Sequence, residues 1–171
     1  MRDDKKIGMF GGKFLPMHKG HELVVKKAFS ECDVVYLCLF VNSPEEKTVA
    51  KAWYTDKDFR YYQLKKAAEK ARTEILSCYG RSVDYTILVI DCDKYQKNGM
   101  EDWYAEAEYI KRRAKRIDMV FSSERGYDYF FNKAYPGAEH IIVDPKRTVF
   151  SISATDIRNM DDVDEQIWWM V

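Results

Sequence analysis

The chain has 171 residues, of which 46% are hydrophobic and 33% charged, a balance typical of a globular protein, and we expect residues 1–171 to form one domain. The 28 basic and 28 acidic residues cancel, which argues against a nucleic-acid-binding protein. No apolar run is long enough to span a membrane, and the charged Met1–Lys6 precedes no signal-peptide core, so we expect a cytoplasmic protein. Four cysteines without a C-x-x-C pair, and only three histidines, argue against a structural zinc site.

Apolar runs and helix-type spacing alternate along the chain. The predicted elements are a strand at Lys6–Phe10, a helix at Lys19–Ser30, a strand at Asp33–Val41, a polar loop at Asn42–Ala50, a helix from Thr55 or Asp56 toward Leu76, a strand at Val83–Ile90, a polar loop at Asp91–Gly99, a helix at Met100–Arg116, strands at Asp118–Phe121 and His140–Val143, and a final helical segment at Ser153–Asn159. This alternation predicts an α/β fold with about five parallel strands. Ligands of such sheets bind beyond the carboxyl ends of the strands.

The segment after the first predicted strand has the composition of a phosphate-binding loop. It reads GGKFLPMHKGH from Gly11 to His21, and its glycines allow close backbone approach to a ligand. His18 and His21 are three residues apart at the start of a helix, so both can face a bound phosphate. The alternative is a glycine-rich turn followed by two incidental histidines. The spacing matches neither a Walker A loop nor G-x-G-x-x-G.

A second phosphate-binding pattern lies near the carboxyl end. In SISATDIR, Ser151 to Arg158, either Ser153 or Thr155 can cap a helix, and Arg158 adds a guanidinium one turn later. Taken alone, this pattern is an ordinary helix N-cap.

The two segments together resemble the signature of the nucleotidyltransferases with the H-x-G-H motif. The matching residues are G-K-F-x-P-x-H-K-G-H at Gly12–His21 and I-S-x-T-x-I-R at the second segment. The resemblance implies a Rossmann-like nucleotidyltransferase fold, with helices on both faces of the sheet. With Phe121–Glu124 and Val143–Thr148, the chain resembles the bacterial nicotinamide-mononucleotide adenylyltransferase domain. That domain is often fused to a kinase, whose Walker A loop is missing here, so we expect a stand-alone enzyme.

The resemblance implies transfer of AMP from ATP to nicotinamide mononucleotide, giving NAD and pyrophosphate. It assigns the catalytic roles to His18, His21 and Arg158, with His21 neutralising charge near the α-phosphate. The implied ATP-binding residues are Gly11, Gly12, Lys13, Phe14, Ser122, Ser123, Glu124, Ser153 and Thr155. Mg²⁺ would be bound mainly through the ATP phosphates, so we expect no metal site made by the protein.

The acceptor side is less well marked. Tyr95–Trp103 resembles a family loop, Y-x-x-G-W-x-x-W, with Met100 in place of its first tryptophan. By this resemblance Trp103 stacks on the nicotinamide ring, helped by Asn42 or Tyr95; alternatively, Trp103 is a core residue of its helix. Arg60 either meets a substrate phosphate or forms an ion pair on its helix. Lys47 either holds a phosphate or is simply solvated.

Several alternatives stay open. The acceptor could be nicotinic acid mononucleotide, phosphopantetheine or, with CTP, an alcohol phosphate, and a non-catalytic module that senses ATP or NAD is a further reading. We interpret His140 as structural. The apolar Ile167–Met170 either docks on the core or forms a subunit contact, which leaves a homo-oligomer open.

Overall fold

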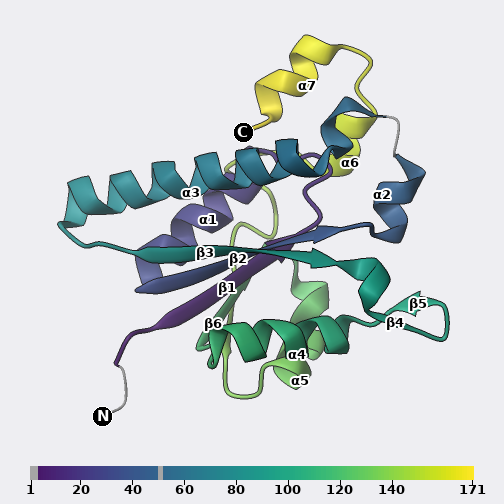
Figure 1. Ribbon diagram of the computed structural model, residues 1–171. Helices are drawn as coiled ribbons and strands as arrows, with labels where there is room; N and C mark the ends of the chain where they lie inside the picture. The colour runs from purple at the N-terminus through teal and green to yellow at the C-terminus, as the bar shows by residue number, and fades with distance from the viewer. Residues whose placement is uncertain (1–3, 50–51) are drawn as a thin grey trace.

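Five parallel strands form the central sheet of the protein (Figure 1). The computed structural model describes residues 4–49 and 52–171. The strands are β1 (Ile7–Gly12), β2 (Val34–Val41), β3 (Asp84–Asp91), β6 (Met119–Ser122) and β7 (Glu139–Ile142), in the order β3-β2-β1-β6-β7. Every neighbouring pair is parallel. The predicted five-stranded α/β sheet is therefore confirmed.

The strand order reverses its direction of growth at β1. The chain builds β2 and β3 on one side of β1, then crosses through α4 (Trp103–Ala114) to the other side and adds β6 and β7. Loops that leave β1 and β6 at their carboxyl ends therefore diverge and open a crevice between them. This switch point places the candidate site.

Two helices cover one face of the sheet, α1 (Lys19–Glu31) and α3 (Lys57–Tyr79) (Figure 1). Asp56 caps α3 by accepting a 2.8 Å hydrogen bond from the backbone N–H of Phe59, and Gly80 ends it with a φ of 62°. The predicted inner face of α3 is buried against α1 and the sheet, and includes Leu64, Ala67, Ala68 and Ala71. This layer forms the larger core.

The other face is covered by α4 and by α5 (Asp128–Ala134), a helix that the sequence did not predict. Met9, Ile90 and Val120 of the sheet pack there with Ile110 and Tyr135 in a second core. The prediction of helices on both faces is thus confirmed.

Two predicted loops contain regular structure. Asn42–Ala50 forms the short α2 (Pro44–Thr48), capped by Ser43, and Ala50 lies outside the described residues. Asp91–Gly99 contains a 3-10 turn, η2 (Cys92–Lys94), and strand β4 (Gln96–Lys97) of a hairpin with β5 (Met100–Glu101). Asn98 and Gly99 close this hairpin with positive φ angles of 52° and 74°, as a tight two-residue turn requires.

The hairpin also shortens the helix predicted at Met100–Arg116. Met100 and Glu101 are strand residues, and α4 begins at Trp103 because Asp102 caps it. The Asp102 carboxylate accepts hydrogen bonds of 3.1 Å from the backbone of both Tyr104 and Ala105.

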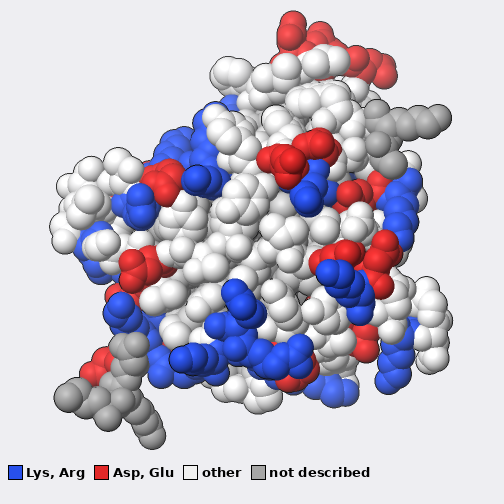
Figure 2. All heavy atoms as spheres, viewed as in Figure 1, with Lys and Arg blue, Asp and Glu red and all other residues white. Residues whose placement is uncertain are grey.

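Two short helices complete the chain, α6 (Ala154–Arg158) and α7 (Val163–Trp169); the remaining 3-10 turns are η1 (Trp53–Thr55) and η3 (Arg125–Tyr127). After α7 the chain docks on the core: the backbone of Val171 donates to Met17 and accepts from the Gln63 side chain at 3.2 Å. Acidic side chains gather at the α7 end, and both signs are mixed over the rest of the face in Figure 2. Among the described residues, no helix is both long and apolar enough to cross a lipid bilayer.

Candidate active site

A cleft of about 420 Å³ opens at the carboxyl ends of β1 and β6. Most of the residues that the sequence singled out line it: Gly11, Gly12, Lys13, Phe14, His21, Trp103, Ser122, Ser123, Glu124 and Arg158. They come from both sides of the switch point, so the crevice predicted from the strand order is where the candidate residues meet.

His18 and His21 form a stacked pair at the start of α1, with ring centroids 3.8 Å apart. Nδ1 of His18 accepts a 3.1 Å hydrogen bond from the backbone N–H of Gly20. Nδ1 of His21 accepts one of 3.2 Å from the backbone N–H of His18. Because a backbone N–H can only donate, each neutral ring must carry its proton on Nε2. The pair therefore presents imidazole N–H donors.

Both rings are neutral at pH 7. Burial, together with the positive charge of Arg147, lowers the pKa of His18 to about 4. Burial and the adjacent His18 lower the pKa of His21 well below its usual value. Neutralisation of phosphate charge by His21 therefore requires that the bound phosphates first raise its pKa.

Arg158 connects the two sequence motifs. Its guanidinium donates to the backbone carbonyl of Leu15 at 2.6 Å and to the hydroxyl of Thr155 at 3.0 Å. Ser153 caps α6 by accepting from the backbone N–H of Asp156 at 3.0 Å. His18, Ser153 and Thr155 are not among the residues that line the cleft. Two of them contact residues that do line it: the backbone N–H of His18 donates to His21, and the Thr155 hydroxyl accepts from Arg158.

Arg147 is a cation that the sequence reasoning missed. Its backbone has a φ of 53°, and its guanidinium donates to the carbonyl of Ile152 at 3.0 Å. It is near enough to lower the pKa of both histidines. Its position in the P-K-R-T stretch after β7, at the ligand edge of the sheet, was the available signal.

A polar chain orders the end of β6. His140 Nε2 lies 2.6 Å from the Ser122 hydroxyl, and His140 Nδ1 contacts the carboxylate of Asp128. His140, which had no partner by sequence, thus ties β7 to β6 and α5. This network fixes the Ser122–Glu124 wall of the cleft.

Acidic side chains surround Lys13 on the opposite wall. Lys13 forms ion pairs with Glu45 and, at 3.3 Å, with Glu101. Burial alone would lower the pKa of Lys13, but these carboxylates outweigh it and raise the pKa. Lys13 therefore stays charged, and any phosphate must compete with two carboxylates for it.

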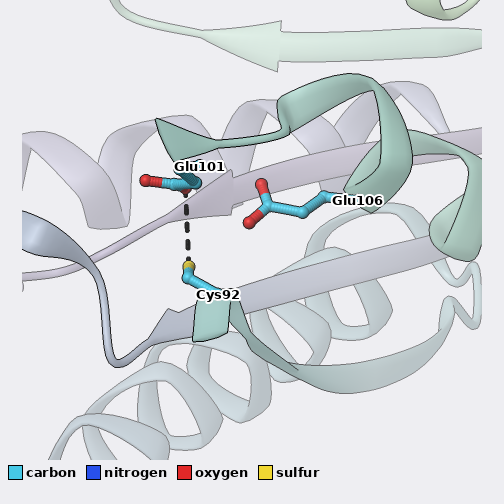
Figure 3. A group of neighbouring side chains, drawn as sticks. All are labelled: Cys92, Glu101 and Glu106. Atoms are coloured by element: carbon cyan, nitrogen blue, oxygen red, sulfur yellow. Dashed lines mark hydrogen bonds between the residues drawn. The ribbon is translucent and has the colours of Figure 1, made fainter. Parts of the chain in front are cut away.

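Glu101 also belongs to a buried group with Cys92 and Glu106 (Figure 3). The three ligand-type atoms lie within 4.8 Å of one another, and Cys92 Sγ is 3.5 Å from a Glu101 carboxylate oxygen. Burial and the neighbouring Glu101 raise the pKa of Glu106 to about 8. Burial and the same carboxylates raise the pKa of the Cys92 thiol. No pattern in the sequence indicates this group.

Trp103 faces the cleft rather than the core. It is 41% exposed and packs edge-on against Tyr127 and Phe130, with ring centroids 6.0 and 5.6 Å away. The alternative of a core tryptophan is wrong, because the hairpin moves the start of α4 to the rim of the cleft.

Four predicted acceptor residues do not line the cleft. Asn42 bonds Asp91 at 2.9 Å, Lys47 pairs with Asp93 at 2.6 Å, and Tyr95 packs in the second core. Arg60 is fully buried and bonds the carbonyl of Lys13 and the carboxylate of Glu46, each at 2.9 Å. Arg60 is 0% exposed, so the predicted contact with substrate is not seen. It does form an ion pair, but with Glu46 of α2 rather than with a residue of its own helix.

The two glycines of the loop have a packing role. Gly11 and Gly12 end β1, and a Cβ on Gly11 would lie 2.8 Å from the ring of Phe40. A Cβ on Gly12 would lie equally close to the ring of Phe14. Aromatic side chains, as well as any ligand, therefore require these positions to be glycine.

The parallel sheet, with a cleft at its switch point, defines an α/β protein of the doubly wound class. A family model described as cytidylyltransferase-like matches residues 9–160. The chain therefore belongs to the cytidylyltransferase-like family, which confirms the resemblance drawn from its two motifs.

Its relatives include proteins named for NAD biosynthesis. The chain is 26% identical to the trifunctional NAD biosynthesis/regulator protein NadR of Escherichia coli, over 92% of this chain and 37% of that protein. It is 30% identical to a probable nicotinate-nucleotide adenylyltransferase of Clostridium perfringens, over 68% of this chain and 50% of that protein. The chain thus spans half or less of the length of these curated relatives.

Solved structures share the fold. A bifunctional NMN adenylyltransferase/ADP ribose pyrophosphatase from Francisella tularensis, complexed with AMP and a manganese ion, superposes with a TM-score of 0.56. It is 20% identical, over 97% of this chain and 44% of that one. The Rossmann-like nucleotidyltransferase fold is thereby confirmed.

Proposed function

We propose that this protein transfers AMP from ATP to nicotinamide mononucleotide, forming NAD and pyrophosphate. The observation that carries the proposal is the stacked His18–His21 pair, in which each neutral ring keeps its N–H on Nε2, with His21 and Arg158 lining the same cleft at the switch point. The names of the relatives from Escherichia coli and Clostridium perfringens support the same reaction class. Nicotinic acid mononucleotide is the alternative acceptor.

The reaction needs positioning and charge stabilisation rather than a general base. An oxygen of the acceptor's 5′-phosphate, already an anion, attacks the α-phosphorus of ATP. A new P–O bond forms while the bond to the β-phosphate bridging oxygen breaks, and pyrophosphate leaves with that electron pair. The His21 N–H and the Arg158 guanidinium would stabilise the charge that develops on these oxygens.

Mg²⁺ would enter as the counterion of ATP. The phosphate end of the cleft offers His21, Arg158 and, behind it, Thr155. Imidazole N–H and guanidinium groups bind phosphate oxygens rather than Mg²⁺, so the ion would keep phosphate and water ligands. It would then neutralise part of the triphosphate charge.

The test is turnover of ATP, Mg²⁺ and nicotinamide mononucleotide, with dinucleotide and pyrophosphate measured together. His21→Ala should lower kcat by about 10²- to 10³-fold, the usual effect of losing one such donor. Circular dichroism and thermal melting should show an intact fold. A His21→Ala protein that keeps more than a tenth of the activity would refute the mechanism. Binding of NAD without turnover by the unaltered protein would indicate a sensor instead.

A further inference from the structure

Glu106 is a buried acid with an unused hydrogen-bonding atom in the wall of the cleft. It lies on the first turn of α4 and is 3% exposed. Its Oε1 has no hydrogen-bond partner among residues 4–49 and 52–171. Figure 3 shows its carboxyl group turned toward Glu101 and Cys92. A buried polar atom without a partner is costly, so this one points to a ligand that completes it.

The neighbours of Glu106 determine what it offers. Glu101 of β5 and Cys92 of η2 flank it, the Lys13 ammonium pairs with Glu101, and Tyr135 faces it from beyond α5. Since burial and Glu101 raise the pKa of Glu106 to about 8, its carboxyl group is largely protonated at pH 7. The two acids thus present one O–H donor beside carboxylate acceptors.

This combination matches a primary carboxamide. The NH₂ group of an amide donates to a carboxylate, and its carbonyl accepts from a protonated acid. A carboxylate ligand offers only acceptors, and it would place a negative charge beside the carboxylate of Glu101. The pair therefore favours an amide over an acid.

The position of Glu106 fits the acceptor ring. Trp103 and Glu106 are three residues apart on α4 and both line the cleft, so they share one face of the helix. A ring stacked on Trp103 would direct its substituent toward Glu106. The two histidines lie at the start of α1, on a different element from Trp103 and Glu106.

We propose that Glu106, positioned beside Glu101, selects the carboxamide of nicotinamide mononucleotide against the carboxylate of the nicotinic acid analogue. This inference rests on the proposed function, because it assigns specificity within the same site. It assigns to one residue the choice between the amide and the acid acceptor, which the names of the relatives do not decide.

The test is the ratio of kcat/KM for the two acceptors in Glu106→Gln, which keeps the side chain's shape and removes its ionisation. The ratio of amide to acid should fall by about 2- to 10-fold, the value of a hydrogen bond between uncharged groups, because Glu106 is largely protonated at pH 7. Glu108→Gln is the matched control: it makes the same change on α4, at an exposed residue paired with Lys111. It should leave both kcat/KM values unchanged.

A pH profile separates specificity from simple packing. The amide-to-acid ratio of the unaltered protein should change between about pH 7 and 9 as Glu106 ionises, and should be flat in Glu106→Gln. If Glu106→Gln lowers kcat/KM for both acceptors equally, with no change of ratio, Glu106 is structural and the proposal is overturned.

Binding of each acceptor without ATP, followed by the part of the tryptophan fluorescence change that Trp103→Phe removes, makes the inference independent of turnover. If the protein turns over neither acceptor but binds the amide selectively, and Glu106→Gln abolishes that selectivity, the proposed reaction fails and the specificity stands. Binding of neither acceptor overturns both. Zinc in the purified protein is measured as well. If the unaltered protein holds nearly one zinc ion per chain and Glu106→Gln loses it, then Cys92, Glu101 and Glu106 form a metal site and the proposal is overturned.

Discussion

Acid should destabilise this protein through its buried histidine pair. An unfolded histidine titrates near its usual pKa of 6.5, whereas the pKa of His18 in the fold is about 4. Between about pH 4 and pH 6.5, His18 therefore binds a proton in the unfolded chain but not in the folded protein. The stability that depends on neutral His18 is complete above about pH 6.5 and is lost as the pH falls toward 4.

The size of the effect follows from the shift. One pKa unit corresponds to about 1.4 kcal/mol, so His18 alone should cost about 3 kcal/mol once the pH is below 4. At pH 5.0 the loss should be about 2 kcal/mol. His18 is 7% exposed, so solvent screening reduces this little. The pKa of His21 is also lowered and adds to the loss in the same direction.

The perturbation that isolates this contribution is His18→Asn. Asparagine keeps an N-cap acceptor for the backbone of Gly20 but does not titrate. Urea unfolding at pH 7.5 and pH 5.0 gives the free energy of unfolding of both proteins. The unaltered protein should lose at least about 2 kcal/mol more than His18→Asn between these values, since removing His18 also lessens the lowering of the His21 pKa. Equal losses in the two proteins would show that His18 is not held neutral by its surroundings.

Three further substitutions test the packing and the site. Gly8→Ala should lower the free energy of unfolding, measured in urea, by about 1–3 kcal/mol, because the new Cβ would lie 2.6 Å from Cys32 Sγ. Gly126→Ala is the control and should change the free energy little, because nothing lies within 4 Å of its Cβ. Equal effects of the two substitutions would contradict this reasoning. Asp56→Ala should cost about 1 kcal/mol through the lost cap of α3, and an unchanged thermal midpoint would count against that cap. Arg158→Lys cannot hold both Leu15 and Thr155, so kcat should fall at least about tenfold with an unchanged melting temperature; full activity would remove Arg158 from the mechanism.

Local patterns in the sequence were sufficient for most of the fold. The buried apolar run Val34–Val41 and the helical spacing of Leu64, Ala67, Ala68 and Ala71 each specify an element whose side chains are buried as predicted. Helix α5 was missed because its 7 residues make barely two turns, too few for a helical stripe to be recognised. The hairpin before α4 was missed because two strands of two residues have too little pattern to detect.

The phosphate end of the site could be predicted because its residues lie in two compact motifs. His18, His21, Thr155 and Arg158 are each placed by a helix start, and a helix start is written in the local sequence. The acceptor end could not be predicted in this way. Arginine is a residue type that often binds phosphate, but Arg60 lies on the buried face of α3, where it forms an ion pair with Glu46.

The sequence by itself therefore determined the sheet, the main helices and the positions of the two motifs to which we assign phosphate binding, since these depend on neighbours in the chain. Only the tertiary structure decided the protonation states of the histidine pair and of Glu106. The histidines are neutral because the folded chain buries them near Arg147. Glu106 holds its proton because the hairpin brings Glu101 against it in a buried wall of the cleft. Burial and the approach of charges are properties of the assembled fold, and they set the chemistry that each residue type can perform.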